Sequence, residues 1–273
     1  MIHDRPRGLL LVMFLAILAE FGWRLASNRG YNLRVAAGSL GVATGNLLFG
    51  IANGAAIAVV LQGVWMLAPV RWPLGDWRTW AAGFLLTELA YYAFHRMSHE
   101  VRWMWASHAV HHSAEELTLL AAIRLGWTNF ASGAWLAYVP LVLAGFDPRL
   151  VLGLLAFNLH YQFFLHTELV GRLGPLEWVL NTPAHHRVHH ASNPAYLDRN
   201  YGGVLIVFDR LFGTFATERR DEPIRYGLTR PVTSANPFVL ALEEWRLLLA
   251  ELRSRPTWRQ RLALALGRPG ASP

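Results

Sequence analysis

The chain has 273 residues, no cysteine, and a formal net charge of +7 in which every basic side chain is arginine. Without cysteine, disulfides, thiolate metal sites and cysteine nucleophiles are excluded. Charged residues make up only 16% of the chain, against about a quarter in soluble proteins. Together with twelve tryptophans, this favours a membrane protein. The arginines flank apolar runs and form no solvated patch of their own, so we expect no nucleic-acid partner.

Five apolar runs are each expected to cross a membrane as a helix, since about 20 apolar residues span a bilayer core. They cover residues 8–23, 44–70, 79–94, 127–146 and 149–165, and Pro140 interrupts the fourth. No small-residue cleavage site follows the first run, which favours a membrane helix over a signal peptide. A polar loop containing Arg24, Arg29 and Arg34 is expected to follow it.

The arginine distribution predicts an orientation for these helices. If the first, third and fifth runs exit on one side, that side receives the arginine-rich C-terminal third together with Arg24, Arg29, Arg34, Arg96, Arg102 and Arg124. The other side receives only Arg5, Arg7, Arg71, Arg78 and Arg149. The positive-inside rule makes that side cytoplasmic. The predicted fold is therefore all-α: a multi-pass integral membrane helical bundle with a cytoplasmic helical cap lined by histidines.

Eleven of the twelve histidines lie in one window, and only His3 lies outside it. They form the clusters His95-x3-His99, His108-x2-His111-His112 and His185-His186-x2-His189-His190, with His160 and His166 between the second and third clusters. Residues three and four apart share a face of a helix, so each cluster can direct imidazoles to one point. Imidazole is the commonest metal ligand of proteins. The sequence therefore predicts a polyhistidine metal centre at the cytoplasmic face.

Ligand counting then selects the kind of centre. A lone histidine usually packs in a core, and this reading is assigned to His3 and His160. Clusters buried at a membrane boundary are costly without a metal. A zinc ion takes three or four protein ligands, so eight or nine imidazoles fit two ions with open positions. Nitrogen-rich sites with open positions suit iron and oxygen chemistry, which favours a non-haem di-iron oxygenase.

Three other classes are disfavoured by the same residues. A zinc hydrolase would normally show H-E-x-x-H, but the interior of the first cluster is Arg-Met-Ser. A bis-histidine haem carrier needs histidines that face each other in the middle of the membrane. A metal transporter needs ligands within the crossings, where only Glu20, Glu88 and His160 qualify.

The clusters and their flanks resemble a known family. The stretches that carry the likeness are Tyr91–His99, His108–Ser113, His166–Glu168, Gly174–Trp178, Asn181–His190, Asn200–Gly203 and Asp209–Phe215. In order and spacing they resemble the fatty acid hydroxylase / sterol desaturase superfamily of membrane di-iron enzymes. Within it, the likeness is closest to alkylglycerol monooxygenase-like bacterial members, and it fades after about Thr229.

This resemblance implies a set of metal ligands for two iron ions. They are His95, His99, His108, His111, His112, His166, His186, His189 and His190. His185 is either a further ligand or a residue that orients one. Glu88, Glu115, Glu168 and Asn181 are candidates to orient metal-bound imidazoles, with a cap or surface charge as the alternative for each. Glu88 lies seven residues before His95, which places both on one helix face.

The predicted function is O2-dependent hydroxylation of an unactivated or ether-adjacent C–H of a membrane lipid, with lipid or sterol desaturation by the same site as the alternative. Electrons are expected from a separate donor protein, and the likeness to the alkylglycerol subgroup raises a pterin as a further cofactor. The expected organisation is N-terminal transmembrane helices over 1–78, a di-iron hydroxylase/desaturase domain over 79–230, and an amphipathic C-terminal tail over 231–273.

Overall fold

Two long N-terminal helices carry most of the apolar sequence. The computed structural model describes residues 5–270, and the predicted core residue His3 lies outside this range. All of the described secondary-structure elements are helices. Helix α1 spans Arg5–Ala26 and α2 spans Leu33–Met66. Both are long and apolar enough, by length and composition, to cross a membrane. These are two of the five crossings expected, and the other three do not meet the same criterion among the described residues.

The outer surface of these helices is apolar. Only 11% of the apolar window of α1 and 6% of that of α2 is buried against the rest of the chain. On α2, Leu48, Ile51 and Val59 are each more than 70% exposed. Soluble monomers rarely expose contiguous apolar patches of this extent, so a surface of this kind suits contact with lipid.

Helix α2 begins earlier than the second apolar run. Its N-cap is Asn32, whose side chain accepts hydrogen bonds from the backbone N–H groups of Arg34 and Val35. Arg34 is therefore in the first turn of α2, and Arg24 is in the last turn of α1. The prediction that both belong to a loop is wrong, because helix caps extend each helix beyond its apolar residues.

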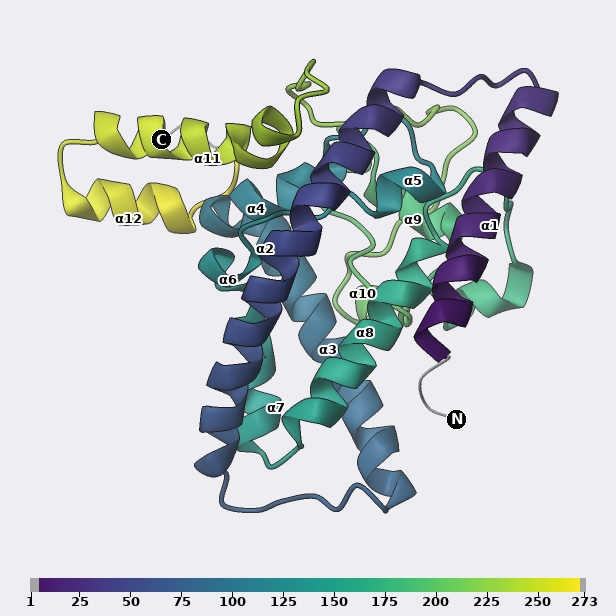
Figure 1. Cartoon of the computed structure of the whole chain (residues 1–273). Helices are drawn as coiled ribbons and strands as arrows, with labels where there is room; N and C mark the ends of the chain where they lie inside the picture. Colours follow the sequence, from purple (N-terminus) through teal and green to yellow (C-terminus); the bar gives the residue numbers. More distant parts are fainter. Residues whose placement is uncertain (1–4, 271–273) are drawn as a thin grey trace.

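Helix α8 (Pro148–Phe163) packs against both α2 and α3 (Trp77–Glu100). Figure 1 shows the three as long crossing rods. A Cβ at Gly83 of α3 would lie 2.9 Å from the Leu150 side chain, so this glycine permits the close approach of α8. Helix α3 continues without a break through His95 and His99, which carries both side chains out of the apolar region on one helix.

The fourth apolar run is interrupted, as expected, but at Gly133 and after Tyr138. It is divided into α6 (Asn129–Ser132), the 3-10 helix η1 (Ala134–Tyr138) and α7 (Val139–Leu143), and Pro140 lies in the first turn of α7. Gly133 has φ +74°, a left-handed conformation that ends α6. Hydropathy averages over such a break and therefore does not detect it.

The remaining helices form a cap at one end of the long helices. They are α4 (Arg102–His112), α5 (Leu119–Ala122), η2 (Gly174–Trp178), α9 (Pro183–His189), α10 (Val207–Leu211), α11 (Pro237–Ser254) and α12 (Trp258–Leu266). The predicted amphipathic stretch from Phe238 to Leu266 forms α11 and α12. In Figure 1 these two helices make a hairpin that runs across the direction of α2.

Two charged side chains of α1 tie it to the cap. Glu20 accepts hydrogen bonds from the backbone N–H of Leu119, at 2.7 Å, and from the Thr167 hydroxyl. Arg24 lies 3.1 Å from Glu168 and 3.4 Å from Glu116, and its side chain is only 5% exposed. These contacts fix α1 against the segments that precede α5 and follow α8.

We expect Arg24→Ala to destabilise the detergent-solubilised protein by about 2–3 kcal/mol, because it strands two carboxylates at a mostly buried contact. Arg29 is the matched control: it contacts the same Glu168, at 3.4 Å, but its side chain is 49% exposed. Arg29→Ala should cost less than about 1 kcal/mol. Thermal unfolding of both variants measures the difference, and equal losses would contradict a buried tie at Arg24.

Candidate metal centre

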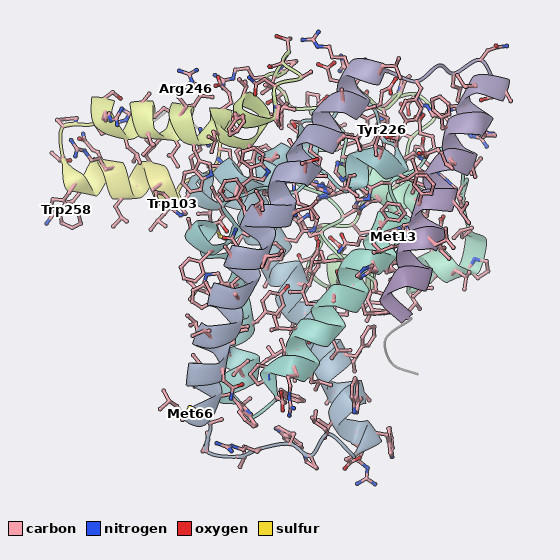
Figure 2. The ribbon with its side chains drawn as sticks, in the orientation of Figure 1. Met13, Met66, Trp103, Tyr226, Arg246 and Trp258 are labelled. Atoms are coloured by element: carbon pink, nitrogen blue, oxygen red, sulfur yellow. The ribbon has the colours of Figure 1, made fainter. Side chains whose placement is uncertain are left out.

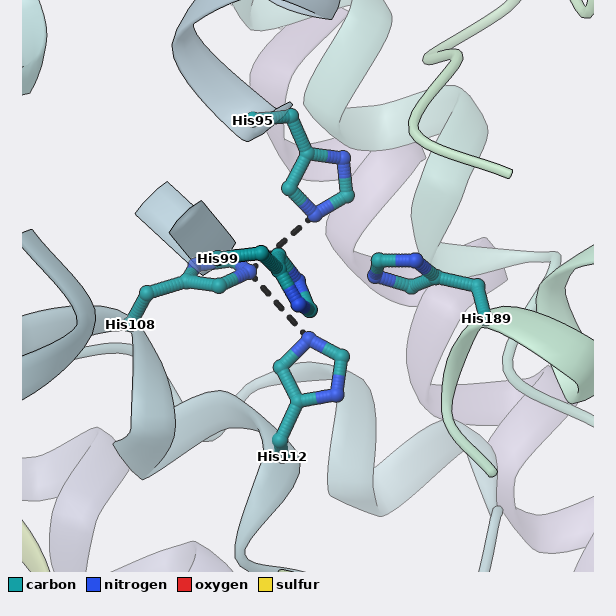
Figure 3. A group of neighbouring side chains, drawn as sticks. All are labelled: His95, His99, His108, His112 and His189. Carbon is teal, nitrogen blue, oxygen red and sulfur yellow. Dashed lines mark hydrogen bonds between the residues drawn. The ribbon is translucent and has the colours of Figure 1, made fainter. Parts of the chain in front are cut away.

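Nine histidines converge at the junction of the long helices and the cap, in two adjoining groups. The first group contains His95, His99, His108, His112 and His189, and the second contains His111, His166, His186 and His190. Within each group one ring nitrogen of every member lies within 4.8 Å of the others. Figure 3 shows the five rings of the first group directed at a common centre. The nine are the nine that the resemblance implied as ligands.

Helical spacing explains how the groups form. His95 and His99 are one turn apart on α3, and His108 and His112 are one turn apart on α4, so each pair shares a face. His111 is adjacent to His112 and therefore points about 100° away around the helix axis, which delivers it to the second group.

The second group is completed from the far side of the cap. His166 follows the end of α8, and His186 is on α9. Helix α9 begins with Pro183, whose fixed φ suits a first helical position, and ends at His189, with His190 as its C-cap. His189 of the same helix joins the first group, so α9, like α4, supplies both. The rings of His112 and His190, from different groups, stack with centroids 4.3 Å apart.

Burial keeps these imidazoles neutral. Removal from water lowers the pKa of His111 to about 4 and that of His189 to about 3. The pKa values of His108, His112, His186 and His190 are also lowered well below the usual range, chiefly by burial and then by neighbouring histidines. A neutral imidazole has a free lone pair, which is the form that binds a metal.

The hydrogen bonds show where those lone pairs point. Nδ1 of His166 lies 2.7 Å from the carbonyl oxygen of Gln162, and Nδ1 of His111 lies 3.3 Å from that of Arg124. A carbonyl only accepts, so each Nδ1 carries the proton and each Nε2 carries a lone pair. Yet the two Nε2 atoms are 3.0 Å apart. This contact cannot be a hydrogen bond; two facing lone pairs call for a cation between them.

Ring nitrogens of the first group lie equally close together. His95 donates from Nδ1 to the carbonyl oxygen of Tyr201 at 2.8 Å, and its Nε2 lies 3.1 Å from that of His108. His189 donates from Nδ1 to the carbonyl of Arg199 at 3.0 Å, and its Nε2 has no hydrogen-bond partner. Two nitrogens bound to one ion at about 2.1 Å, with a right angle between them, lie about 3.0 Å apart. The residues therefore fit a metal ion in each group.

Two histidines of the window stay outside both groups. His160 lies on α8 and its Nδ1 contacts only the Ala156 carbonyl of the same helix, at 2.6 Å. His185 is buried against Phe215, with ring centroids 5.2 Å apart, and neither of its ring nitrogens has a hydrogen-bond partner. His185 is thus next to the ligand candidate His186 in sequence but faces another part of the cap.

Backbone carbonyls occupy the positions in which carboxylates were expected. Glu115 is exposed, and Glu168 contacts Arg24, Arg29 and the Tyr226 hydroxyl. Neither forms a hydrogen bond with a histidine of the two groups among the described contacts. Glu168 therefore serves to hold α1 against the cap, and Glu115 is a surface charge.

Glu88 and Asn181 do not contact the histidines themselves. They form hydrogen bonds with the backbone of residues 200–205, the segment that carries the Tyr201 carbonyl. Glu88 accepts from the backbone N–H groups of Val204 and Leu205, at 2.8 and 3.0 Å. The Asn181 side chain donates to the Gly202 carbonyl at 2.6 Å. The prediction that Glu88 and His95 face the same way is confirmed, because both contact this one segment.

Sequence reasoning missed three residues of this framework. Asp209 accepts from the backbone N–H groups of Tyr201 and Gly202, both at 2.7 Å. Asn158 donates to Glu88 at 2.6 Å, and Gln162, whose carbonyl accepts from His166, donates to Asn158. A buried polar chain thus runs from the segment behind His95 to the segment behind His166. The only sequence signal was that uncharged polar residues interrupt the fifth apolar run.

A cavity of about 550 Å³ adjoins the first group. Its wall includes His99, His112 and His189, together with Trp105 and Leu228. The second group does not line it. A small molecule that enters this cavity meets the first group directly.

We expect Glu88→Ala to weaken metal binding about 10- to 100-fold, as loss of groups that orient ligands does elsewhere. The variant leaves the N–H groups of Val204 and Leu205 without acceptors and frees the carbonyl that orients His95. Glu115→Ala is the control and should leave affinity unchanged. Chelator competition on the purified protein measures both, and an unaltered affinity in Glu88→Ala would contradict the positioning role.

Residues 80–214 match the fatty acid hydroxylase family. Alkylglycerol monooxygenase of Xenopus tropicalis is 43% identical over 195 residues, which are 71% of this chain and 43% of that protein. The human alkylglycerol monooxygenase is 42% identical over 71% of this chain and 43% of its own length. An ornithine lipid hydroxylase of Rhizobium tropici is 30% identical over 60% of this chain and 49% of its own.

The chain spans less than half the length of these relatives. No solved structure matches it. The matched region contains all nine histidines of the two groups and the framework that supports them. The superfamily expected from the three clusters is therefore confirmed: residues 80–214 are a fatty acid hydroxylase domain, and the chain belongs to the fatty acid hydroxylase superfamily.

Proposed function

We propose that this protein is a membrane-bound di-iron monooxygenase that hydroxylates a lipid. The observation that carries the proposal is the pair of adjoining histidine groups, with five and four imidazoles, whose lone pairs converge. Nine nitrogen ligands exceed what one ion binds and suit two iron ions with open positions. The names of the relatives, alkylglycerol monooxygenase and ornithine lipid hydroxylase, support a lipid substrate.

The overall reaction consumes one O2, two electrons and two protons, and it yields a hydroxylated lipid and water. Bound iron supplies the oxygen activation that no protein side chain provides. The first group would hold one iron and the second group the other. We assign the electrons to an external donor and place the histidine face on the cytoplasmic side, where the positive-inside pattern puts it.

The protein's own residues would orient the metal ligands, shield the site from water and admit the substrate. Carbonyls of Tyr201, Arg199, Gln162 and Arg124 hold protons on Nδ1 and so present Nε2 of four imidazoles to the ions. Burial of the groups excludes bulk water. The apolar outer faces of α1 and α2 keep the protein in the lipid phase, and the cavity beside His99, His112 and His189 would bring the substrate carbon to the first group.

Metal content tests the site. Protein purified with iron should contain about two iron ions per chain. His112→Ala should lose iron from the first group and His111→Ala from the second, although the two residues are neighbours. Iron analysis and chelator titration read out both variants.

His160→Ala and His185→Ala are the matched controls, because both histidines lie in the same window but outside the groups. Each should retain the full iron content. A single zinc ion that survives His112→Ala would sink the di-iron proposal, and so would iron loss in His160→Ala.

Product analysis tests the reaction. Membranes or nanodiscs that contain the iron-loaded protein, a 1-O-alkylglycerol, O2 and a reductase should form a product that carries one atom of 18O from labelled O2. Parallel reactions with a reduced pterin identify the electron source. The His111→Ala variant should form no labelled product. An unsaturated product without 18O would instead indicate the desaturase alternative.

A further inference from the structure

The α11–α12 hairpin has an exposed apolar face that nothing in the described chain covers. On α12, Trp258, Leu262 and Leu266 are 68%, 49% and 60% exposed. They follow one another at four-residue intervals and therefore form one stripe along the helix. This stripe is separate from the apolar surfaces of α1 and α2.

The charge of the hairpin identifies the chemistry of what it contacts. Residues 252–270 contain five arginines and no acidic residue. Arg268 lies 3.5 Å from Glu100 and 3.8 Å from Asp198 of the cap, which leaves four arginines for an external partner: Arg253, Arg255, Arg259 and Arg261. Arg259 lies over the Trp258 ring, 5.6 Å from its centroid, so a cation and the apolar stripe adjoin. Leucine and tryptophan beside arginine are typical of helices that lie at the surface of an anionic bilayer.

The position of the hairpin along α2 places it at the height of a bilayer surface. The N-terminus of α11 packs on α2 at Gly38 and Gly41, where an added Cβ would meet Leu240 at 2.9 Å and Pro237 at 3.1 Å. From Gly41, α2 continues for 25 residues to Met66, which is about 38 Å of helix. Figure 1 shows α12 on the Met66 side of α11. Subtracting about 9 Å for the packing of two helices leaves about 29 Å, close to the bilayer core of about 30 Å.

The orientation of the two faces agrees with that height. Figure 2 shows Trp258 on the side of the hairpin turned toward Met66, and Arg246 on the opposite side. A bilayer that surrounds α2 from Met66 up to the hairpin would therefore meet the stripe of α12. The hairpin crosses the direction of α2, so it would lie flat on that surface.

We propose that α12 docks on the anionic surface of the bilayer that α2 crosses. Trp258, Leu262 and Leu266 would lie in the interfacial region, and the four arginines from Arg253 to Arg261 would lie at the lipid phosphates. The hairpin also fixes the height of the metal centre. Helix α11 packs on α4, where the Trp103 and Trp245 rings are 4.9 Å apart and Arg102 lies 3.1 Å from Glu244. Helix α4 carries three of the nine histidines, which sets the two groups at the lipid–water boundary.

The cysteine-free chain allows a direct test in the full-length protein. Single cysteines at Leu262→Cys and Arg246→Cys carry an environment-sensitive fluorophore in nanodiscs of neutral lipid with and without phosphatidylserine. Arg246 is the matched control, since its side chain is 67% exposed on the other face of the hairpin. We expect a headgroup-attached nitroxide to quench the label at 262 by at least about threefold more than the label at 246, with aqueous iodide showing the reverse.

Phosphatidylserine should strengthen the quenching at 262, and Arg259→Gln with Arg261→Gln should remove that increase. High salt should act in the same direction, because it screens surface charges. Equal iodide quenching at 262 and 246 would overturn the proposal, since the stripe would then face water. Protection of position 262 from both quenchers would also overturn it, because another protein surface would then cover the stripe. Neither readout depends on metal or on turnover.

Discussion

The architecture of the cap depends on how nine buried imidazoles can coexist. Burial keeps them neutral, and hydrogen bonds to carbonyls fix the proton of several rings on Nδ1. The Nε2 atoms of neighbouring rings then lie 3.0–3.2 Å apart. In the His111–His166 pair, where both protons are on Nδ1, the two Nε2 lone pairs face one another and repel. An ion that accepts both lone pairs converts this repulsion into bonding. The cap therefore places two groups of imidazoles, each of which could hold a metal ion, at its centre.

Because backbone carbonyls orient the imidazole rings, the rings are correctly placed only if the backbone that carries those carbonyls is held rigidly. A carboxylate can rotate to meet an imidazole, whereas the Tyr201 carbonyl is placed only if the segment 200–205 is fixed. Glu88, Asn181 and Asp209 fix it from three sides, through five hydrogen bonds to its backbone. Gly203 lets Asn158 approach, since an added Cβ would lie 1.9 Å from its amide nitrogen. Buried polar residues of the apolar helices are thus used to hold a loop.

Most of the predicted histidine grouping followed from the periodicity of the α-helix. The spacing of His95 and His99, and of His108 and His112, places each pair on one helix face, and the structure brings those pairs together. What sequence could not supply were partners far apart in the chain. Glu88 contacts a segment 116 residues later, and no local pattern identifies it as a loop anchor. The choice of His186 over His185 likewise depends on the direction of α9, which tertiary packing sets.

The position of the break in the fourth apolar run could not be predicted, for a related reason. Hydropathy measures whether a segment tolerates lipid, and residues 127–146 do so. It does not measure whether the backbone runs straight, and Gly133 in a left-handed conformation breaks this segment into three short helices. These pieces pack against α2 and α3, with Val142 fully buried beside Leu61. The segment therefore contributes to the core between the long helices, a role that an apolar composition serves equally well.

The two histidine groups are not independent units of the fold. Helices α4 and α9 each supply both groups, while α3 contributes only to the first and the end of α8 only to the second. An ion in the first group would tie α3 to α4 and α9, and α4 and α9 are also needed for the second group. Occupancy of the first group would therefore help to order three of the four histidines of the second, namely His111, His186 and His190. A cap made of short helices, several of them too short to be stable alone, gains its rigidity from this sharing.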